Sequence, residues 1–167
     1  MDYVWSPWRY PYMEQVNKEK QPECIFCEAL ARGDDAESLI VHRGKKAFVI
    51  LNRFPYTSGH VMIVPYAHVA TLELCDSGAL QEMMELAQRV EKAFVANYKP
   101  DGMNLGMNLG KAAGAGVAGH LHLHALPRWF GDTNFMTVTG ETRVHPEELA
   151  VTSSKTIFST SLEVAYA

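Results

Sequence analysis

The stretch HLHLHALPR, residues 120–128, decides the fold. Three histidines occupy every second position, and alternate side chains of a β-strand point to the same face. The three imidazoles are therefore expected on one face of a strand, while the intervening leucines and Ala125 face the core. Pro127 has no backbone N–H to donate to a neighbouring strand, so it is expected to end this one.

Three interpretations of the histidine row are open. An amphipathic strand could carry polar residues there, but a row of imidazoles without Ser, Thr or Lys favours histidine chemistry. A metal bound by all three is excluded, because His120 and His124 start about 13 Å apart while metal–nitrogen bonds are about 2 Å long. Two neighbouring histidines could share an ion. Catalysis or anion binding is therefore the favoured interpretation.

The segment before the row, residues 110–119, reads GKAAGAGVAG and contains no carboxylate. Glycines allow consecutive backbone N–H groups to converge on an anion, as in phosphate-binding loops. A merely flexible turn could have the same composition. Next to the histidines, however, the segment predicts a phosphate held by amides, and a neutral histidine beside it could attack the phosphorus as a nucleophile.

The motif Asn108-x-Gly110, the glycine-rich loop and the alternating histidines together resemble the signature of the histidine triad superfamily of nucleotidyl hydrolases and transferases. The resemblance extends from Cys24 to about Met136. It implies an α+β fold, with a mainly antiparallel five-stranded sheet, one long helix and shorter helices. It also implies a homodimer.

Composition limits the class of protein. The chain has 167 residues, of which 47% are hydrophobic and 20% charged, which is typical of one globular domain. A net charge of −4 argues against a nucleic acid as partner. We find no apolar run near the ~20 residues of a membrane span and no apolar signal core. Three cysteines are too few for a disulfide framework, so a cytoplasmic location is expected.

The chain is expected to divide into three parts. Residues 1–20 form an aromatic N-terminal arm, whose prolines argue against a helix and whose rings should pack on the sheet or on a second subunit. Residues 21–140 form the histidine triad domain. Residues 141–167 form a C-terminal extension that packs on the same domain.

Hydrophobic periodicity predicts the main elements. A hairpin is expected from strands at 38–42 and 47–51, followed by a buried strand at 60–65. A helix capped by Asp76 or Ser77 should run to about Tyr98, because its apolar residues repeat with helical spacing. The segment 103–110 is expected to pair with the histidine strand and to deliver Asn108 to the glycine-rich loop.

Cys24 and Cys27 form a single CxxC, which by itself fits core thiols, a redox pair or half of a metal site. Because there is no second CxxC, a structural zinc would need histidines as its other ligands. In triad relatives with a CxxC, the partners are the first triad histidine and the histidine of a Pro-x-x-His segment. The resemblance therefore implies a structural zinc bound by Cys24, Cys27, His68 and His120.

The resemblance also implies catalytic and binding roles. His122 would be the nucleophile, and His124 and His60 would stabilise charge on the phosphoryl oxygens. Asn52, eight residues before His60, would contact the ribose, although it could instead stabilise a turn, and His60 could simply end a strand. The α-phosphate would be bound by Asn108 and the loop amides of Gly114, Ala115, Gly116 and Val117.

The expected function is cleavage of a nucleoside phosphate bond through a covalent nucleotidyl-histidine, with a dinucleoside polyphosphate such as diadenosine tetraphosphate as substrate. Residues 128–136 resemble the tail of triad enzymes that act on such compounds. Water as acceptor gives hydrolysis, and inorganic phosphate gives phosphorolysis. Gly116 stands where many hydrolase relatives carry Gln or Ser, which leaves room for a second anion. A non-catalytic nucleotide sensor and a zinc-binding interaction module are the remaining hypotheses.

Overall fold

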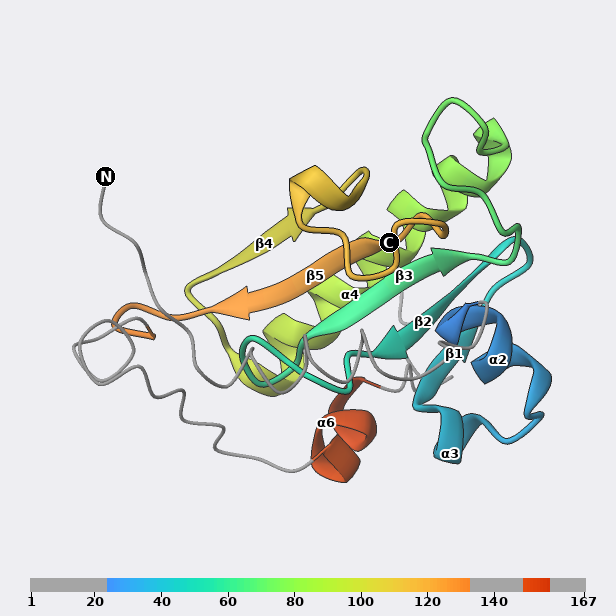
Figure 1. The fold of residues 1–167 in the computed structure, drawn as a ribbon. Helices are drawn as coiled ribbons and strands as arrows, with labels where there is room; N and C mark the ends of the chain where they lie inside the picture. Colours follow the sequence, from blue (N-terminus) through green and yellow to red (C-terminus); the bar gives the residue numbers. More distant parts are fainter. Residues whose placement is uncertain (1–23, 133–148, 157–167) are drawn as a thin grey trace, which may run out of the picture.

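The computed structural model describes residues 24–132 and 149–156 (Figure 1). The predictions for the N-terminal arm concern residues outside this part of the chain. The helices are α2 (Ile25–Ala31), α3 (Asp35–Ser38), α4 (Ser77–Tyr98), the short 3₁₀ helix η1 (Lys111–Ala113) and α6 (Leu149–Thr156). The strands are β1 (Ile40–Arg43), β2 (Ala47–Leu51), β3 (Val61–Pro65), β4 (Gly102–Gly106) and β5 (Leu123–Arg128).

The five strands form one antiparallel sheet in the order β1-β2-β3-β5-β4. Together with one long helix and several shorter ones, this confirms the expected α+β fold. The histidine strand β5 lies between β3 and β4. The sequence predicted that the segment 103–110 would pair with this strand, and β4 does so. β1 and β4 are the edge strands, and β4 is largely exposed.

One face of the sheet is covered by α4, which begins and ends where the sequence predicted. Asp76 caps the helix by accepting a hydrogen bond from the Ala79 N–H, and Lys99 ends it in the left-handed conformation at φ 47°. Its apolar stripe packs against the sheet. The buried residues of this core are Val41, Ala47, Val49, Leu51, Val61, Ile63, Met83, Leu86, Ala87, Val90, Phe94, Leu123 and Ala125.

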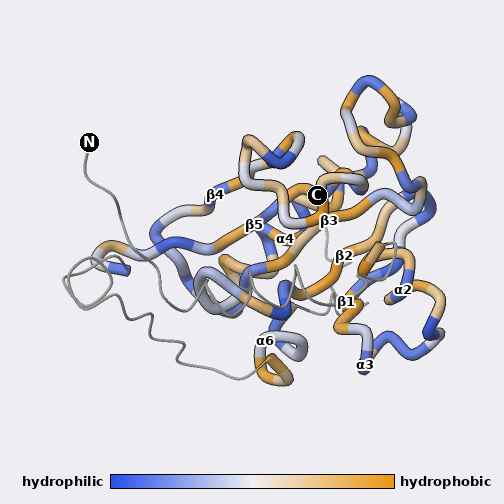
Figure 2. The backbone as a smooth tube through the Cα atoms, in the orientation of Figure 1, coloured by the Kyte–Doolittle hydropathy of each residue, from blue (hydrophilic) through white to orange (hydrophobic). Residues whose placement is uncertain are grey.

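The opposite face of the sheet carries a second buried cluster, to which α2 contributes. The sheet can be apolar on both sides because β2 and β3 are almost continuous apolar runs, visible as orange tube in Figure 2. We call this second group the α2-side cluster. It consists of Cys24, Phe26, Ala29, Ile40, Phe48, Ile50, Met62 and Val64.

The histidine strand begins and ends later than expected. β5 starts at Leu123, so His120 and His122 precede it, and it continues through Pro127. The Arg128 carbonyl accepts a bond from Asp101 on the β4 side, so the nitrogen of the preceding residue faces the opposite side. β3 begins only at Val61, opposite Ala125, so it has no residue paired with Pro127 and no ladder bond is lost at the proline. The prediction that Pro127 ends the strand is therefore wrong.

The first strand of the hairpin is also shorter than expected. Ser38 closes α3, and Leu39 turns the chain in the left-handed conformation at φ 63°, so β1 begins only at Ile40. The hairpin turn is held from outside by Glu82 of α4. The carboxylate of Glu82 accepts the backbone N–H groups of Lys45, Lys46 and Ala47. A helix thus fixes a turn that the sequence predicted from local composition alone.

The described part of the C-terminal extension, α6, packs against α4. The Asn97 side chain donates a hydrogen bond to the Lys155 carbonyl at 3.0 Å, and the Lys155 ammonium lies 4.8 Å from the centre of the Tyr98 ring. Thr152 is buried. In the described residues we find no helix with the length and apolar character needed to cross a bilayer.

Candidate active site and metal centre

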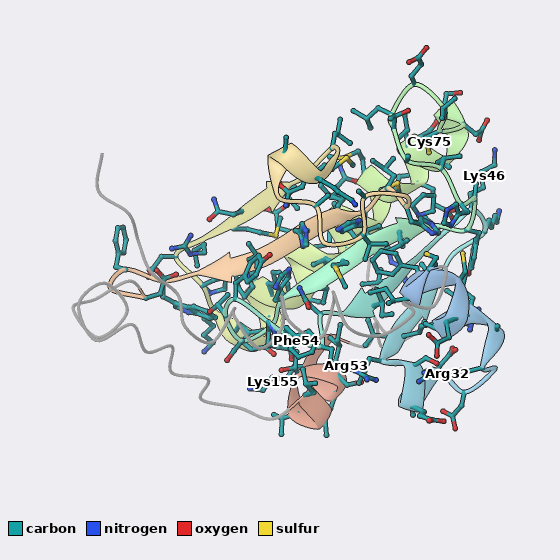
Figure 3. All side chains as sticks on the ribbon, in the orientation of Figure 1. Arg32, Lys46, Arg53, Phe54, Cys75 and Lys155 are labelled. Carbon is teal, nitrogen blue, oxygen red and sulfur yellow. The ribbon has the colours of Figure 1, made fainter. Side chains whose placement is uncertain are left out.

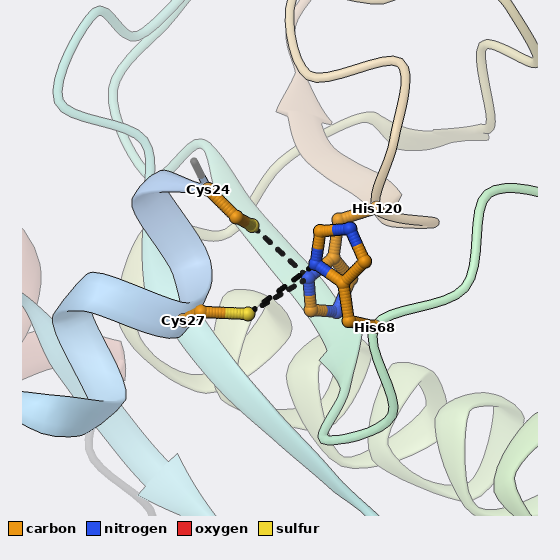
Figure 4. A group of neighbouring side chains, drawn as sticks. All are labelled: Cys24, Cys27, His68 and His120. Atoms are coloured by element: carbon orange, nitrogen blue, oxygen red, sulfur yellow. Dashed lines mark hydrogen bonds between the residues drawn. The ribbon is translucent and has the colours of Figure 1, made fainter. Parts of the chain in front are cut away.

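Four potential metal ligands meet beside the first histidine of the row. Cys24 and Cys27 come from the start of α2, His68 from the loop after β3, and His120 from the segment before β5 (Figure 4). One ligand atom from each residue lies within 4.8 Å of all the others. The shortest of these distances is 3.2 Å, between the Cys24 sulfur and the Nδ1 of His120. The sequence predicted this group of four residues.

The protonation of His120 suits a ligand. Its Nε2 lies 2.9 Å from the Pro65 carbonyl oxygen, which can only accept, so Nε2 carries the proton and Nδ1 presents its lone pair to the cysteines. Burial first, and then the neighbouring His68 and His122, lower the pKa of His120, while its bond to Pro65 opposes this. A neutral imidazole fixed by a carbonyl, beside two thiols, is the donor set that tetrahedral zinc prefers.

The third cysteine, Cys75, lies just before α4 and outside this group (Figure 3). It is buried with Ala79 and Leu121. Burial is the first cause, and the nearby Asp76 the second, of the raised pKa of its thiol. Cys75 is therefore an apolar packing residue.

His122 is 5% exposed, and a backbone carbonyl two residues earlier in the chain binds its ring. Its Nδ1 lies 2.8 Å from the carbonyl oxygen of His120, so Nδ1 donates and Nε2 keeps a free lone pair. Within the described residues, Nε2 has no hydrogen-bond partner. Burial lowers the pKa of His122, and the bond to His120 opposes this. The neutral ring therefore presents an unprotonated nitrogen, as a nucleophile requires.

His60 and His124 form a directed hydrogen-bond chain. The N–H of Tyr56 points at Nδ1 of His60 at 3.2 Å, so this nitrogen accepts and the proton sits on Nε2. His60 Nε2 lies 2.9 Å from Nδ1 of His124 and donates to it. His124 consequently carries its own proton on Nε2. This leaves His124 as a hydrogen-bond donor, while the adjacent His122, whose ring centre is 4.9 Å away, offers a lone pair.

Asn52 supports the same chain. Its Oδ1 accepts from the Phe54 N–H at 2.9 Å, which stabilises the turn, and its Nδ2 lies 3.3 Å from Nδ1 of His60. Both the turn-stabilising role and a place beside His60 are therefore seen. The following residues, Arg53 and Phe54, are labelled in Figure 3. Phe54 is exposed.

Burial also controls the electrostatics of the third histidine. Burial, and to a smaller extent the neighbouring His122, lowers the pKa of His124 to about 4. At neutral pH His124 is thus uncharged. It can donate the Nε2 proton in a hydrogen bond without placing a positive charge beside His122.

The glycine-rich loop reaches the same face of the sheet, because Val117 packs against the α2-side cluster. Gly110 and Gly114 have φ values of 79° and 88°, which only glycine adopts readily. The backbone N–H groups of Gly114 and Ala115 already donate to the carbonyl oxygens of Lys111 and Gly110 within the loop. Among the predicted phosphate donors, the amides of Gly116 and Val117 have no acceptor within the described part of the chain.

Asn108 lies beyond the end of β4. The last pair of the β4–β5 ladder joins Gly106 to His124, and Asn108 follows two residues after it. The side chain is half-buried and makes no hydrogen bond to another described residue. Its amide is therefore available to a ligand.

Sequence reasoning missed two residues that touch the histidines. Phe26, inside the CxxC, contacts the rings of His120 and His122 at 5.3 and 5.1 Å between centroids. Tyr56 packs on His60 at 4.7 Å and binds it through its backbone N–H. Both aromatic residues were visible in the sequence, but nothing local indicates what a ring will face after folding. Trp129 packs edge-on against Tyr98, with ring centres 6.2 Å apart.

Comparison with protein families and with curated proteins gives consistent matches. A family model described as the HIT domain matches residues 34–131. A protein of Mycobacterium tuberculosis named AP-4-A phosphorylase is 36% identical over 151 residues, which cover 87% of this chain and 77% of that protein. An uncharacterized HIT-like protein of Saccharolobus solfataricus is 30% identical over 113 residues, or 68% of this chain and 79% of its own length.

Solved structures have the same fold. A hypothetical histidine triad nucleotide-binding protein from Sulfolobus tokodaii is 28% identical, with a TM-score of 0.64 over 79% of this chain and 88% of that one. A zinc-bound histidine triad family protein from Mycobacterium smegmatis is 27% identical, with a TM-score of 0.62 over 79% of this chain and 94% of that one. Zinc is thus present in a related protein of known structure.

Proposed function

Because the chain belongs to the HIT domain family, we propose that it is a nucleotidyl transferase that cleaves dinucleoside polyphosphates through His122. The observation that carries the proposal is the Nε2 of His122, whose lone pair is left free by the bond from Nδ1 to the His120 carbonyl. A nucleotide sensor would need only donors for the phosphates. An unprotonated imidazole nitrogen at this position favours an enzyme.

The reaction proceeds in two steps. Nε2 of His122 forms a bond to the α-phosphorus, and the bond from that phosphorus to the bridging oxygen breaks, with the electron pair leaving on the polyphosphate. An oxygen of the acceptor then bonds to phosphorus, the phosphorus–nitrogen bond breaks, and its electron pair returns to Nε2. The Nε2–H of His124 and the chain behind it, His60 and Asn52, stabilise charge on the phosphoryl oxygens.

Substrate binding is proposed for the groups around the nucleophile. The amides of Gly116 and Val117, which have no acceptor among the described residues, and the side chain of Asn108 would contact the α-phosphate, and Gly114 and Ala115 would shape the loop. Asn52 is proposed to contact the ribose through the edge that faces away from His60.

Inorganic phosphate is the acceptor that we favour. Gly116 has no side chain to occupy the space beside the α-phosphate, and the mycobacterial relative is named a phosphorylase. Incubation with diadenosine tetraphosphate, with and without phosphate, tests this. Phosphorolysis yields ADP plus ATP and depends on added phosphate, whereas AMP plus ATP identifies hydrolysis. The absence of any product would refute the enzyme and leave the sensor.

Zinc at Cys24, Cys27, His68 and His120 is proposed as a structural ion. When bound, it would cross-link α2 to two loops and supply no reacting group. The alternative of an interaction module would not require a catalytic histidine beside the metal. Metal analysis of the purified protein tests this part, because one zinc per chain is expected.

The protein is further proposed to be a cytoplasmic homodimer. β4 is an edge strand that leaves its outer backbone groups available for pairing, and Leu105 and Leu109 on this side are 43% and 41% exposed. Sedimentation equilibrium measures the assembly, and a mass of one chain would contradict it.

A further inference from the structure

Phe26 occupies an unusual position between the metal centre and the nucleophile. It lies between Cys24 and Cys27 in the first turn of α2 and is fully buried. Its ring meets that of His120 edge-on, at an interplanar angle of 77°, and that of His122 at 51°. A single aromatic ring thus touches both a metal ligand and the residue proposed to attack phosphorus.

His122 needs such a neighbour because its hydrogen bond alone does not fix the ring. A single bond from Nδ1 to the His120 carbonyl leaves the imidazole free to tilt about the bond axis. Tilting would move Nε2, on the far side of the ring, away from the line of attack. The rings of Phe26 and His124 are the aromatic contacts that limit this motion among the described residues. Misplacement of a reacting atom by about 1 Å can lower a rate about 100-fold.

The position of Phe26 is in turn set by the cysteines on either side of it. The thiol sulfurs of Cys24 and Cys27 lie 3.2 and 3.7 Å from Nδ1 of His120. The same His120 supplies the carbonyl that holds His122. The turn that carries Phe26 and the backbone that carries the nucleophile therefore converge on His120.

We propose that Phe26 is a positioning residue for His122, held against the imidazole by the Cys24–Cys27 turn. This inference rests on the proposed nucleophilic role of His122. It adds a residue that the sequence does not mark, and it gives the metal-binding turn a second task besides cross-linking the fold. Phe26 has no group that could react, and it acts only through the orientation of the histidine ring.

A matched control is available in the same cluster. Phe48 is also fully buried in the α2-side cluster, but its ring stacks on Tyr66, 5.4 Å away, and on none of the active-site histidines. The variants F26L and F48L therefore remove the same atoms from similarly buried sites. They differ in whether the lost ring contacts His122. F26M serves as a second variant if F26L does not fold.

The experiment compares the wild type, F26L and F48L, all loaded with zinc. Turnover of diadenosine tetraphosphate gives kcat and KM, elemental analysis gives the zinc content, and long-range ¹H–¹⁵N correlation spectra give the tautomer of the His122 ring. F26L should lower kcat about 10- to 100-fold with KM within about threefold, at full zinc content. Its spectrum should change from the single Nδ1–H tautomer to a mixture. F48L should leave kcat and the spectrum close to those of the wild type.

Three results would overturn the inference: an unchanged kcat and tautomer in F26L, an equal loss in F48L, or a loss in F26L that follows loss of zinc. If the wild-type protein itself turns over no dinucleotide, the proposed function fails. The ring spectrum then decides the role of Phe26 alone, because the tautomer of His122 is measured without substrate.

Discussion

The hydrogen-bonded pair of His60 and His124 makes a quantitative prediction about stability and pH. The pKa of His124 is lowered to about 4 in the folded protein, compared with about 6.5 in an unfolded chain. Between these values the unfolded state binds more protons than the folded state, so stability must fall as the pH is lowered from 6.5 towards 4. At 1.36 kcal/mol per pH unit, His124 accounts for a loss of about 3 kcal/mol at pH 4.

The variant His124→Gln isolates this contribution. Glutamine can still accept the bond from Nε2 of His60 and donate one of its own, but it does not titrate. Urea unfolding of both proteins from pH 7 to pH 4 gives the two free energies of unfolding. Because both chains carry the same cysteines and other histidines, effects of metal loss cancel in the difference. The wild type should lose about 3 kcal/mol more than the variant. A difference that stays constant within about 0.5 kcal/mol across this range would refute the neutral state of His124.

Further predictions concern the nucleophile, the metal and one glycine. His122→Asn should abolish turnover by orders of magnitude while nucleotide binding, measured by calorimetry, stays within about tenfold; near-normal turnover would contradict the assignment. Cys27→Ser should reduce bound zinc well below one per chain in elemental analysis and lower the melting temperature, and an unchanged zinc content would exclude Cys27 as a ligand. Gly59→Ala should cost about 1–3 kcal/mol, because φ is 83° and an added Cβ would lie 2.9 Å from the Pro127 ring. Gly33→Ala has a φ of 73° but open space, so an equal cost in the two variants would refute the contact with Pro127.

The sequence was most informative where the pattern depends on side-chain chemistry. The CxxC, together with the resemblance to triad proteins, predicted a group of four potential metal ligands, and the fold brings these residues together from three separate segments. The apolar stripe of α4 and its cap at Asp76 predicted where this helix begins and ends. Periodicity succeeds in such cases because burial of an apolar face imposes it directly.

It was least informative where a distant contact decides the local structure. Pro127 can continue β5 because β3 has no residue opposite it, and the length of β3 is a property of a neighbouring strand. The turn after β1 depends on Glu82, 35 or more residues away in the chain. Phe26 and Tyr56 contact histidines that lie far from them in the chain or across a turn, and these contacts exist only in the folded protein. Sequence composition cannot indicate these partners, because each is chosen by tertiary packing.

The account stands on Nε2 of His122 as the atom that attacks phosphorus. Its most direct test is to mix the protein with diadenosine tetraphosphate in the absence of phosphate, quench in alkali within milliseconds and map the modified peptide by mass spectrometry. We expect an adenylyl group on the peptide that contains His122, released as ADP when phosphate is added before the quench. An unmodified peptide in protein that has released ATP, or an adenylyl group on another residue, would contradict the nucleophilic role of His122.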